Sequence, residues 1–391
     1  MDAKTIQALD RQYIAATYAR FAPVFVRGKG CCLYDEAGKR YIDMGSGIAV
    51  SGLGYGHKAW ERAVCKQVKA LAHASNLYHT QPQALLAQAL CQRTGMKKVF
   101  FGNSGAEANE CLIKAARKYA AGLYGENQRP VILTLEGSFH GRTLAALAAT
   151  GQEGFHHDFG PFPQGFAHIP PNDIPALEAA LGRQDVCALL LETIQGEGGV
   201  LPLRPEYVKA ARRLTQEKGV LLLLDEVQTG NGRTGMLYSF EHFGIVPDAF
   251  STAKGLAGGL PMGACLLGEK LENTLTPGSH GSTFGGNPVC AAGALAVLES
   301  LTSELLSQVT AKGDYLRREL EAAPGVLGVT GLGLMLGVET RKDPKEVVKA
   351  LLEKGVVALT AKNKLRLLPP LTIPWKELRE ALSQIKEGIA P

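Results

Sequence analysis

The sequence predicts an α/β protein with a mostly parallel central sheet and a smaller α+β domain formed by both ends of the chain. Short apolar runs, typical of strands buried on both faces, alternate with longer segments of helical periodicity through the middle of the chain. Several of these runs stop at an acidic residue or just before a lysine. Ligands bind at the carboxyl ends of the strands in open α/β sheets, so we expect the site at that edge. A length of 391 residues favours one large and one smaller domain.

The segment from residue 220 to residue 254 organises the predicted sheet. The apolar run of residues 220–224 indicates a buried parallel strand that ends at Asp225. A second short strand at 249–252 leads to Lys254, and the separation along the chain suits a crossover between neighbouring strands. One carboxylate and one amine are therefore expected to face the same crevice.

The remaining elements follow from apolar periodicity and from glycine and proline punctuation. Before the central segment we expect helices at residues 4–20, 59–72, 104–121, 175–181 and 205–218, and strands at 24–27, 31–34, 40–43, 97–101, 131–135 and 186–191. Residues 151–171 are expected to form a long irregular loop that lines a site. After Lys254 we expect a strand at 262–267, a long helix at 289–307, a helix at 344–354, strands at 356–359 and 364–368, and a final helix.

Three segments make up the predicted domains. Residues 1–50 contribute strands to the small domain, and residues 51–285 form the large domain. Residues 286–391 complete the small domain after a bridging helix. No internal repeat interrupts this organisation.

Composition excludes several classes of function. The net charge of +5 comes from scattered lysines and arginines, which argues against nucleic-acid binding. The eight cysteines contain no C-x-x-C pair, as expected for reduced thiols in a cytoplasmic protein. The chain start lacks an apolar signal core, and no window approaches the apolar length of a membrane span, so neither export nor a membrane is expected. The nine histidines lack zinc-ligand spacing, so no metal is expected.

A glycine-rich segment raises the alternative of a nicotinamide-dependent dehydrogenase. Residues Gly230-Asn-Gly-Arg-Thr-Gly235 match G-x-G-x-x-G, and Asp248 follows at a distance near that of a ribose-binding acid. The dinucleotide motif should turn directly from a strand into a helix, whereas Asp225-Glu-Val-Gln-Thr intervenes here and no clear amphipathic helix follows. The dehydrogenase remains a remote alternative.

A predicted helix start near residue 104 is suited to an anion. Ser104 and Glu107 have the S-x-x-E spacing of a capping box. The N–H groups of Gly105 and Ala106 would then point out of the first turn, where an anion such as a phosphate can bind. An ordinary helix start gives the same pattern, so this signal needs support from elsewhere.

The turn after the predicted strand at 131–135 adds Phe139 and Arg142, an aromatic face and a cation at the ligand edge of the sheet. A lysine, an acid, a phosphate-binding helix end and a stacking ring are together what pyridoxal phosphate requires. Each feature alone is common in proteins of other functions. Their order along one sheet is what favours this cofactor.

Six blocks of sequence closely resemble the class III (ω-amino acid) aminotransferases. They are Asn103-Ser-Gly-Ala-Glu-Ala-Asn109, Ser138-Phe-His-Gly-Arg142, Gln195-Gly-Glu-Gly198, Leu224-Asp-Glu-Val-Gln-Thr-Gly230, Thr252-Ala-Lys-Gly255 and Ser282-Thr-Phe-Gly-Gly-Asn-Pro288. The resemblance implies a fold-type I pyridoxal-phosphate-dependent transferase that forms a homodimer with its sites at the subunit interface. The cofactor would be pyridoxal 5'-phosphate.

The resemblance also implies residue roles toward the cofactor. Lys254 would hold the cofactor and shuttle protons, and Asp225 would keep the pyridine nitrogen protonated. The other cofactor-binding residues would be Ser104, Gly105 and Ala106 at the phosphate, Gln228 at the ring hydroxyl, Phe139 stacked on the ring, and Thr283 reaching the phosphate of the partner subunit.

Substrate contacts are implied in the same way. Arg142 would bind the carboxylate far from the reacting amine, with Ser282 nearby. Arg366 would bind the α-carboxylate of glutamate or 2-oxoglutarate, and Glu197, which is also a catalytic candidate, would neutralise Arg366 when an ω-amine enters.

Within the family, the segments Phe25-Val-Arg-Gly-Lys-Gly30, Gly47-Ile-Ala-Val50 and Ser75-Asn-Leu-Tyr78 resemble the branch that acts on N2-acetyl-L-ornithine. That branch converts N2-acetyl-L-ornithine and 2-oxoglutarate to N-acetyl-L-glutamate 5-semialdehyde and L-glutamate, a step of arginine biosynthesis. Ornithine, 4-aminobutyrate, succinyl-diaminopimelate and carrier-linked lysine remain alternative amino donors.

Overall fold

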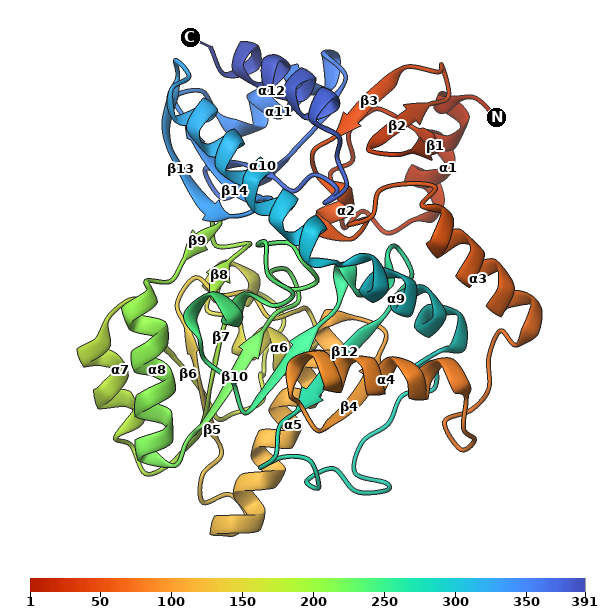
Figure 1. Ribbon diagram of the computed structural model, residues 1–391. Coiled ribbons are helices and arrows are strands. Elements are labelled where there is room, and N and C mark those ends of the chain that lie inside the picture. The colour runs from red at the N-terminus through yellow and green to blue at the C-terminus, as the bar shows by residue number, and fades with distance from the viewer. Residues whose placement is uncertain (391) are drawn as a thin grey trace.

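The computed structural model describes residues 1–390 and is built around a seven-stranded central sheet (Figure 1). Its strands, in spatial order, are β4 (Lys98–Gly102), β12 (Gly263–Leu267), β11 (Ala249–Thr252), β10 (Leu221–Asp225), β7 (Val186–Leu191), β5 (Val131–Leu135) and β6 (Phe166–Ile169). From β11 to β6 all neighbours pair in parallel, whereas β12 runs antiparallel to both β11 and β4. The prediction of a mostly parallel central sheet is confirmed.

The central strands are mostly apolar because both of their faces are buried. In β10, Leu222 and Leu224 belong to one hydrophobic core cluster, whereas Leu221 and Leu223 belong to a second cluster. Successive side chains of a strand point to opposite faces, so an uninterrupted apolar run is what a doubly covered strand requires. Burial of each leucine contributes about 1.5–3 kcal/mol, and Asp225, the one charged residue of the strand, lies at its carboxyl end.

Helices cover the two faces of the sheet. On one face lies α5 (Gly105–Tyr124), together with the short α6 (Leu144–Ala149), whose buried side chains join the cluster of Leu221 and Leu223. The other face is covered by α4 (Gln81–Thr94), α7 (Ile174–Leu181) and α8 (Pro205–Lys218), which contribute to the cluster of Leu222 and Leu224. The helix α4 is an addition to the elements that the sequence predicts.

The two ends of the chain lie side by side at the top of Figure 1. The strands β1 (Phe25–Lys29), β2 (Cys32–Asp35) and β3 (Arg40–Asp43) form one sheet, which β15 (Val356–Val357) extends by pairing in parallel with β3. A second sheet has the order β13 (Val326–Leu332), β14 (Met335–Thr340), β17 (Lys364–Leu367) and β16 (Leu359–Ala361).

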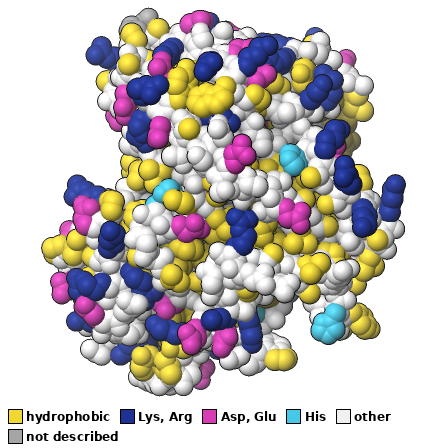
Figure 2. All heavy atoms as spheres, viewed as in Figure 1, with side chains coloured by type: hydrophobic (Ala, Val, Ile, Leu, Met, Phe, Trp, Pro, Cys, Tyr) yellow, Lys and Arg dark blue, Asp and Glu magenta, His cyan; other side chains and the backbone are white. Residues whose placement is uncertain are grey.

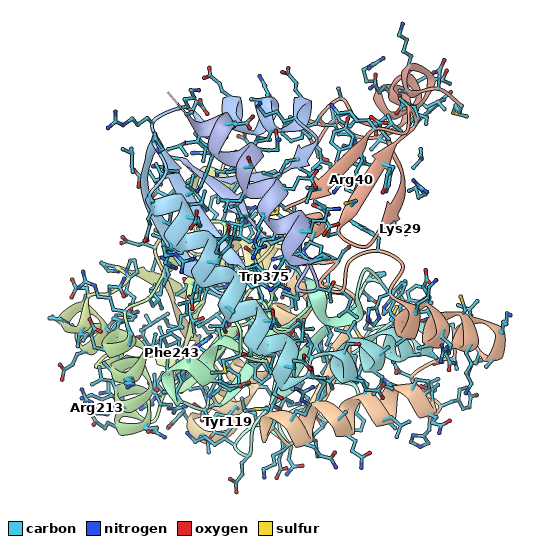
Figure 3. The ribbon with its side chains drawn as sticks, turned by 45° about the horizontal axis from the view of Figure 1, so that its top comes forward. Lys29, Arg40, Tyr119, Arg213, Phe243 and Trp375 are labelled. Atoms are coloured by element: carbon cyan, nitrogen blue, oxygen red, sulfur yellow. The ribbon has the colours of Figure 1, made fainter. Side chains whose placement is uncertain are left out.

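Three long helices accompany these two sheets: α10 (Ser303–Glu321), α11 (Pro344–Glu353) and α12 (Trp375–Ile389). Trp375, at the first turn of α12, lies over α10 (Figure 3), where its ring meets Tyr315 edge to face at 5.5 Å. The remaining elements are the largely buried helix α9 (Pro288–Ser300), the helices α1 (Ala3–Tyr13), α2 (Ser46–Ala49) and α3 (Lys58–Ala70), the short strands β8 (Ile194–Gln195) and β9 (Leu201–Pro202), and the short 3-10 helices η1 (Glu153–Phe155), η2 (Ser239–Phe243) and η3 (Lys254–Ala257).

Three sequence-based expectations about elements are wrong. The first helix was expected at 4–20 but ends at Tyr13, because Ile14 is extended and the helix buries no side chain that could favour a longer one. The loop expected at 151–171 contains β6, which pairs in parallel with β5 at the edge of the sheet. The single helix expected at 289–307 is two helices, α9 and α10, bent by 73°. Thr302 separates them, because its hydroxyl accepts a hydrogen bond from Leu305 and starts a new helix.

Within residues 1–390, no single helix has the length and apolarity needed to cross a bilayer, and α9 and α10 meet those criteria only together, as a bent pair. On the face drawn in Figure 2, lysine and arginine side chains are interspersed with aspartate and glutamate.

The glycine-rich segment at residues 230–235 joins the large sheet to the C-terminal elements. Arg233, fully buried within it, donates hydrogen bonds to the carbonyls of Leu334 (3.0 Å) and Pro369 (2.6 Å). The backbone N–H of Leu334 donates in return to the Arg233 carbonyl at 3.0 Å. A Cβ at Gly235 would lie 2.2 Å from the hydroxyl of Thr310, so only glycine allows this approach.

Asp248, the acid of the alternative dinucleotide motif, is also occupied. It accepts hydrogen bonds from the backbone N–H of Leu222 at 2.8 Å and from Arg212 at 3.0 Å, and it pairs with Lys270 at 3.0 Å. The glycine-rich segment follows a turn and does not lead directly from a strand into a helix, so the match to the dinucleotide motif has a structural origin here.

Replacing Arg233 should test the structural role of this segment. In Arg233→Met, the carbonyls of Leu334 and Pro369 lose their buried donor, so we expect the free energy of unfolding to fall by about 2–4 kcal/mol. Arg213→Met is the matched control, because Arg213 lies on the outer side of α8 (Figure 3) with its side chain 58% exposed and should change stability by no more than about 0.5 kcal/mol. Urea unfolding, followed by tryptophan fluorescence, measures the stability of both variants. Equal losses of stability in the two variants would show that the hydrogen bonds of Arg233 do not stabilise the protein.

Candidate active site

A cavity of about 480 Å³ lies at the carboxyl ends of the parallel strands. It brings together most of the predicted site residues. Its lining includes Ser104, Gly105, Ala106, Phe139, Arg142, Glu197, Asp225, Gln228 and Lys254, together with Val50, Asn103, Asn109, His140, Glu192, Val227 and a segment from Gly259 to Met262. Within residues 1–390, no group of three or more His, Cys, Asp or Glu side chains could hold a metal ion.

Asp225 ends β10 and is held by three donors. Its Oδ2 accepts hydrogen bonds from His140 Nδ1 and Asn109 Nδ2, each at 2.8 Å, and its Oδ1 accepts from the Val227 backbone N–H at 3.0 Å. Burial by itself would raise the pKa of Asp225, but the bond and charge of His140, with the other donors, hold that pKa below its ordinary value. The cavity wall therefore carries a fixed negative charge.

Lys254 follows β11 and begins η3 with a φ of 44°, in the left-handed region that side chains disfavour. Such a backbone conformation costs on the order of 1–3 kcal/mol and is concentrated at functional sites. Among the described residues, the amine has no hydrogen-bond or ion-pair partner. Burial lowers the pKa of Lys254, and the charges of Asp225 and Glu197 offset part of that shift. The cavity therefore contains an amine that is unpaired and easily deprotonated.

The N-terminus of α5 forms another wall of the cavity. Ser104 is its N-cap and accepts a hydrogen bond from the Glu107 N–H at 3.2 Å, while the Glu107 carboxylate accepts from the Asn103 N–H at 2.5 Å. The N–H groups of Gly105 and Ala106, in the first turn, have no partner within the helix. A Cβ at Gly105 would lie 2.7 Å from a methyl of Val227, so a larger residue would displace this wall.

Phe139 and Arg142 lie on the turn after β5. The backbone N–H of Phe139 donates to Glu192 at 2.9 Å, which fixes the turn against β7. The guanidinium of Arg142 lies 5.5 Å from the centre of the Phe139 ring and 4.2 Å from that of Phe155. Within residues 1–390, Arg142 forms no ion pair, so its charge is available to a ligand.

Arg366 has the opposite environment. It lies on β17 and is buried, and its Nη1 donates to Glu197 Oε1 at 2.5 Å and to Gln228 Oε1 at 3.3 Å. Burial by itself would raise the pKa of Glu197, but the charge and hydrogen bond of Arg366 hold it below its ordinary value. The Nε of Arg366 is buried without a partner. Arg366 is therefore separated from the cavity by its two partners, Glu197 and Gln228, which line it.

Ser282 and Thr283 lie outside this cavity. Ser282 borders a separate cavity of about 230 Å³, and its hydroxyl accepts a hydrogen bond from Asn103 Nδ2 at 3.1 Å. Thr283 is exposed. The expectation that Thr283 serves the site of a partner subunit concerns a second chain and stays a prediction.

Several lining residues received no role from the sequence, among them His140, Asn109, Val50 and Glu192. His140 and Asn109 orient Asp225, yet His140 is 85 positions away from it, so no local pattern connects them. Val50 is placed by a left-handed turn, in which Ser46, Gly47, Ile48 and Ala49 all have positive φ values. The sequence could have indicated Glu192 as a site residue, because Glu192 directly follows β7 just as Asp225 ends β10. Burial raises the pKa of Glu192 to about 7.

These residues fit pyridoxal phosphate. The free N–H groups of Gly105 and Ala106, with close packing that only glycine permits, provide an anion cradle. The ionised Asp225 suits a protonated ring nitrogen, and the unpaired amine of Lys254 suits covalent attachment. Phe139 and Val227, which also line the cavity, supply apolar side chains that a flat aromatic ring could contact.

Comparison with known proteins agrees with this fit. The family profile described as aminotransferase class-III matches residues 13–389. The chain is 48% identical over 392 residues to the acetylornithine aminotransferase of Haemophilus ducreyi, covering 100% of both chains. It is 46% identical over 388 residues to that of Caldanaerobacter subterraneus subsp. tengcongensis, covering 97% of this chain and 98% of the relative.

A solved structure is also similar along the whole chain. It is an ornithine aminotransferase from Toxoplasma gondii with partial occupancy of pyridoxal phosphate at its active site. It superposes with a TM-score of 0.94 at 34% sequence identity, covering 99% of this chain and 94% of the other.

The raised pKa of Glu192 predicts a pH-dependent contribution to stability. The folded protein keeps a proton on Glu192 up to a pH of about 7, whereas the unfolded chain releases it near the ordinary value of 4.5. The stability due to this residue is therefore fully present below pH 4.5 and is lost as the pH rises through 7. Glu192→Gln mimics the neutral form, so the stability of wild type relative to this variant should fall between pH 5 and pH 8.

Urea unfolding of cofactor-free protein at several pH values measures this difference. Glu217→Gln is the control, because Glu217 is half-exposed on α8. A difference between wild type and Glu192→Gln that stays constant with pH would show that Glu192 is ionised throughout.

Proposed function

Because this chain belongs to the class III aminotransferase family, we propose that it transfers the δ-amine of N2-acetyl-L-ornithine to 2-oxoglutarate. The products are N-acetyl-L-glutamate 5-semialdehyde and L-glutamate, as in a step of arginine biosynthesis. The protein is a pyridoxal-phosphate-dependent aminotransferase of fold-type I. The observation that carries the substrate proposal is that Arg142 is free of any acid while Arg366 is paired with Glu197.

Pyridoxal phosphate, when bound, supplies an electron sink for the carbon that loses its proton. In this proposal Lys254 holds the cofactor, and its amine takes the proton from the carbon that bears the donor's amine. Burial of Lys254 supports this role, since a lowered pKa keeps a fraction of the amine neutral near pH 7. Asp225 holds a proton on the ring nitrogen, for which its low pKa and its bonds to His140 and Asn109 are suited.

Other residues orient the cofactor in this proposal. Gln228 contacts the ring hydroxyl, and Phe139 stacks on the ring. The phosphate is bound by Ser104, Gly105 and Ala106, and by Thr283 of the partner subunit. The lining of one cavity by the first five of these six residues supports the assignment.

The two arginines define how an amino donor enters. Arg142 binds the carboxylate at the end of the donor opposite the reacting amine, with Ser282 nearby. Glu197 neutralises Arg366 during this half of the reaction, so that an uncharged stretch of donor can lie beside it. When 2-oxoglutarate enters, Arg366 binds its α-carboxylate. The 2.5 Å contact between Arg366 and Glu197 supports the first of these states.

Acetylation suits the donor to this cavity. In N2-acetyl-L-ornithine the α-amine is uncharged, so no second cation lies beside Arg142. In free ornithine that ammonium group would lie next to the guanidinium, and the two positive charges would repel each other. Selectivity for the acetylated donor follows from this difference.

A homodimer is part of the proposal. The segment that carries Thr283 is tied to a neighbouring loop, since Asn76 Nδ2 donates to the carbonyls of Ser282 (3.0 Å) and Gly285 (2.9 Å). Three large apolar side chains of these loops are mostly exposed in the single chain: Leu77, Tyr78 and Phe284. Large apolar side chains that stay exposed in a single chain are often covered by a partner subunit, which supports a dimer here.

Domain division and location complete the proposal. We assign residues 1–50 and 286–391 to the small domain and residues 51–285 to the large domain, supported by the parallel pairing of β3 with β15. A cytoplasmic location is supported by free cysteines, most of which are buried.

A comparison of amino donors tests the proposed substrate. With 2-oxoglutarate as acceptor, kcat/KM for N2-acetyl-L-ornithine should exceed that for free ornithine by at least about tenfold, which needs only about 1.4 kcal/mol of differential transition-state binding. Succinyl-diaminopimelate, carrier-linked lysine and 4-aminobutyrate complete the panel, and Lys254→Ala provides the inactive control. If 4-aminobutyrate is the better donor, the acetylornithine proposal is wrong while the aminotransferase assignment stands.

A mixing experiment tests the shared site. Lys254→Ala and Thr283→Glu should each be nearly inactive alone. A hybrid dimer of the two would contain one site with an intact Lys254 and an intact Thr283 from opposite chains. After joint refolding we expect about a quarter of wild-type activity, since about half of the dimers are hybrids and half of their sites are intact. If hybrids form, as judged by differently tagged chains, without any recovered activity, Thr283 does not serve the partner's site.

A further inference from the structure

Phe155 lies against Arg142, a cavity-lining residue whose guanidinium forms no ion pair within residues 1–390, and Phe155 has no role in the proposal above. It belongs to η1, in the segment that the sequence predicted to be an irregular loop lining a site. The guanidinium carbon of Arg142 lies 4.2 Å from the centre of the Phe155 ring. The Phe155 and Phe139 rings meet edge to face, with centres 5.7 Å apart and planes at 75°. Arg142 is therefore held in contact with two aromatic rings.

Within residues 1–390, the Arg142 side chain donates no hydrogen bond, so its N–H groups are free for a ligand while it contacts the Phe155 ring. A cation over an aromatic ring is attracted to the face of that ring, whereas the five N–H groups of arginine point outward in the plane of the guanidinium. An acidic partner would instead occupy the same N–H groups that a carboxylate ligand needs. Stacking on Phe155 can thus fix the direction of Arg142 without competing with the substrate.

The backbone around Phe155 is tied to the turn that carries Phe139 and Arg142. Gln152 is buried, and its Nε2 donates to the carbonyls of Gly137 (3.2 Å) and Ser138 (3.1 Å). The N–H of Gly151 donates to the Ser138 hydroxyl at 3.0 Å. On the other side of Phe155, His156 Nε2 lies 2.8 Å from the carbonyl of Leu147 in α6. The position of the Phe155 ring relative to Arg142 is thus set by hydrogen bonds on both sides.

We propose that Phe155 is a positioning residue that orients Arg142 toward the distal carboxylate of the amino donor, and so makes the enzyme selective for ω-amines that carry this carboxylate. Phe155 acts through Arg142 and touches no reacting atom. This inference deepens the proposed function and rests on its assignment of Arg142 to the donor carboxylate.

Two donors that differ only in the carboxylate test the proposal. N2-acetyl-L-ornithine carries it, and N-acetyl-1,4-diaminobutane lacks it but presents the same amine and acetyl group. In Phe155→Leu, which keeps the apolar bulk but loses the ring, kcat/KM for acetylornithine should fall about tenfold, mainly through KM, while kcat/KM for the diamine should not change. Phe155→Tyr and Phe155→Trp keep a ring face and should restore the wild-type ratio of the two donors.

Matched controls separate positioning from general damage to the loop. Phe159→Leu changes a ring in the same segment that is 58% exposed, and it should leave the ratio of the two donors unchanged. In an Arg142→Ala background, Phe155→Leu should have no further effect on acetylornithine, because the group that it positions is absent. Equal losses for both donors, or an additive effect in the double variant, would overturn the proposal.

Failure of the proposed function is recognisable in the same experiment. If wild type does not use acetylornithine but uses 4-aminobutyrate, the substrate proposal fails. The inference about Phe155 is then measured as the ratio of 4-aminobutyrate to n-propylamine, which again differ only in the carboxylate. An unchanged ratio in Phe155→Leu would overturn the inference for that donor pair as well.

Discussion

The parallel pairing of β10 with β11 is the constraint on which the rest of the site depends. Asp225 lies opposite Ser251 in the register of these two strands, so β10 and β11 end at the same edge of the sheet. Lys254 follows three residues after Ser251. The pairing also sets the carboxylate itself. Ser251 donates to Asn109 Oδ1 at 2.6 Å, which turns the amide so that Asn109 Nδ2 donates to Asp225 at 2.8 Å. One strand thus delivers an amine to the cavity and orients the acid of its neighbour.

Two buried ionisable groups of the site, Asp225 and Lys254, differ in their hydrogen-bond partners, and this difference has chemical consequences. Asp225 is surrounded by donors that favour its charged form, whereas Lys254 has no partner and burial favours its neutral form. If Lys254 were paired with a carboxylate, its amine would remain protonated and could neither attack a carbonyl carbon nor accept a proton. The same buried surroundings can keep Asp225 charged and Lys254 neutral, because of the two only Asp225 has hydrogen-bond donors around it.

The sequence predicts those parts of this structure that depend on local patterns. Apolar runs located β5, β7 and β10 closely, because a strand buried on both faces is mostly apolar, whereas the buried β11 ends in Ser251 and Thr252 and carries a weaker pattern. The separation of α9 from α10 was missed although Thr302 is a common N-cap residue, because the surrounding residues keep helical periodicity. In the site, Asp225 and Lys254 follow strands and could be found, whereas His140 and Asn109 are recognisable only after the fold places them beside Asp225. The pairing of Arg366 with Glu197 likewise joins residues that are 169 positions apart.

The two arginines show how one cavity can distinguish the ends of its ligands. Arg366 is buried, and its charge is compensated by a carboxylate that lines the cavity, so an anion can bind there only if it displaces Glu197. Arg142 is exposed, and it is held by aromatic rings, which compensate its charge only weakly and leave its N–H groups free. In the proposed function, a ligand with a single carboxylate therefore binds with that group at Arg142. In the same proposal, a ligand with two carboxylates can bind to both arginines. Its second carboxylate then takes the place of the Glu197 carboxylate on Arg366. Because Arg366 forms an ion pair and Arg142 forms only cation–π contacts, the two ends of the cavity differ in how readily they bind a carboxylate.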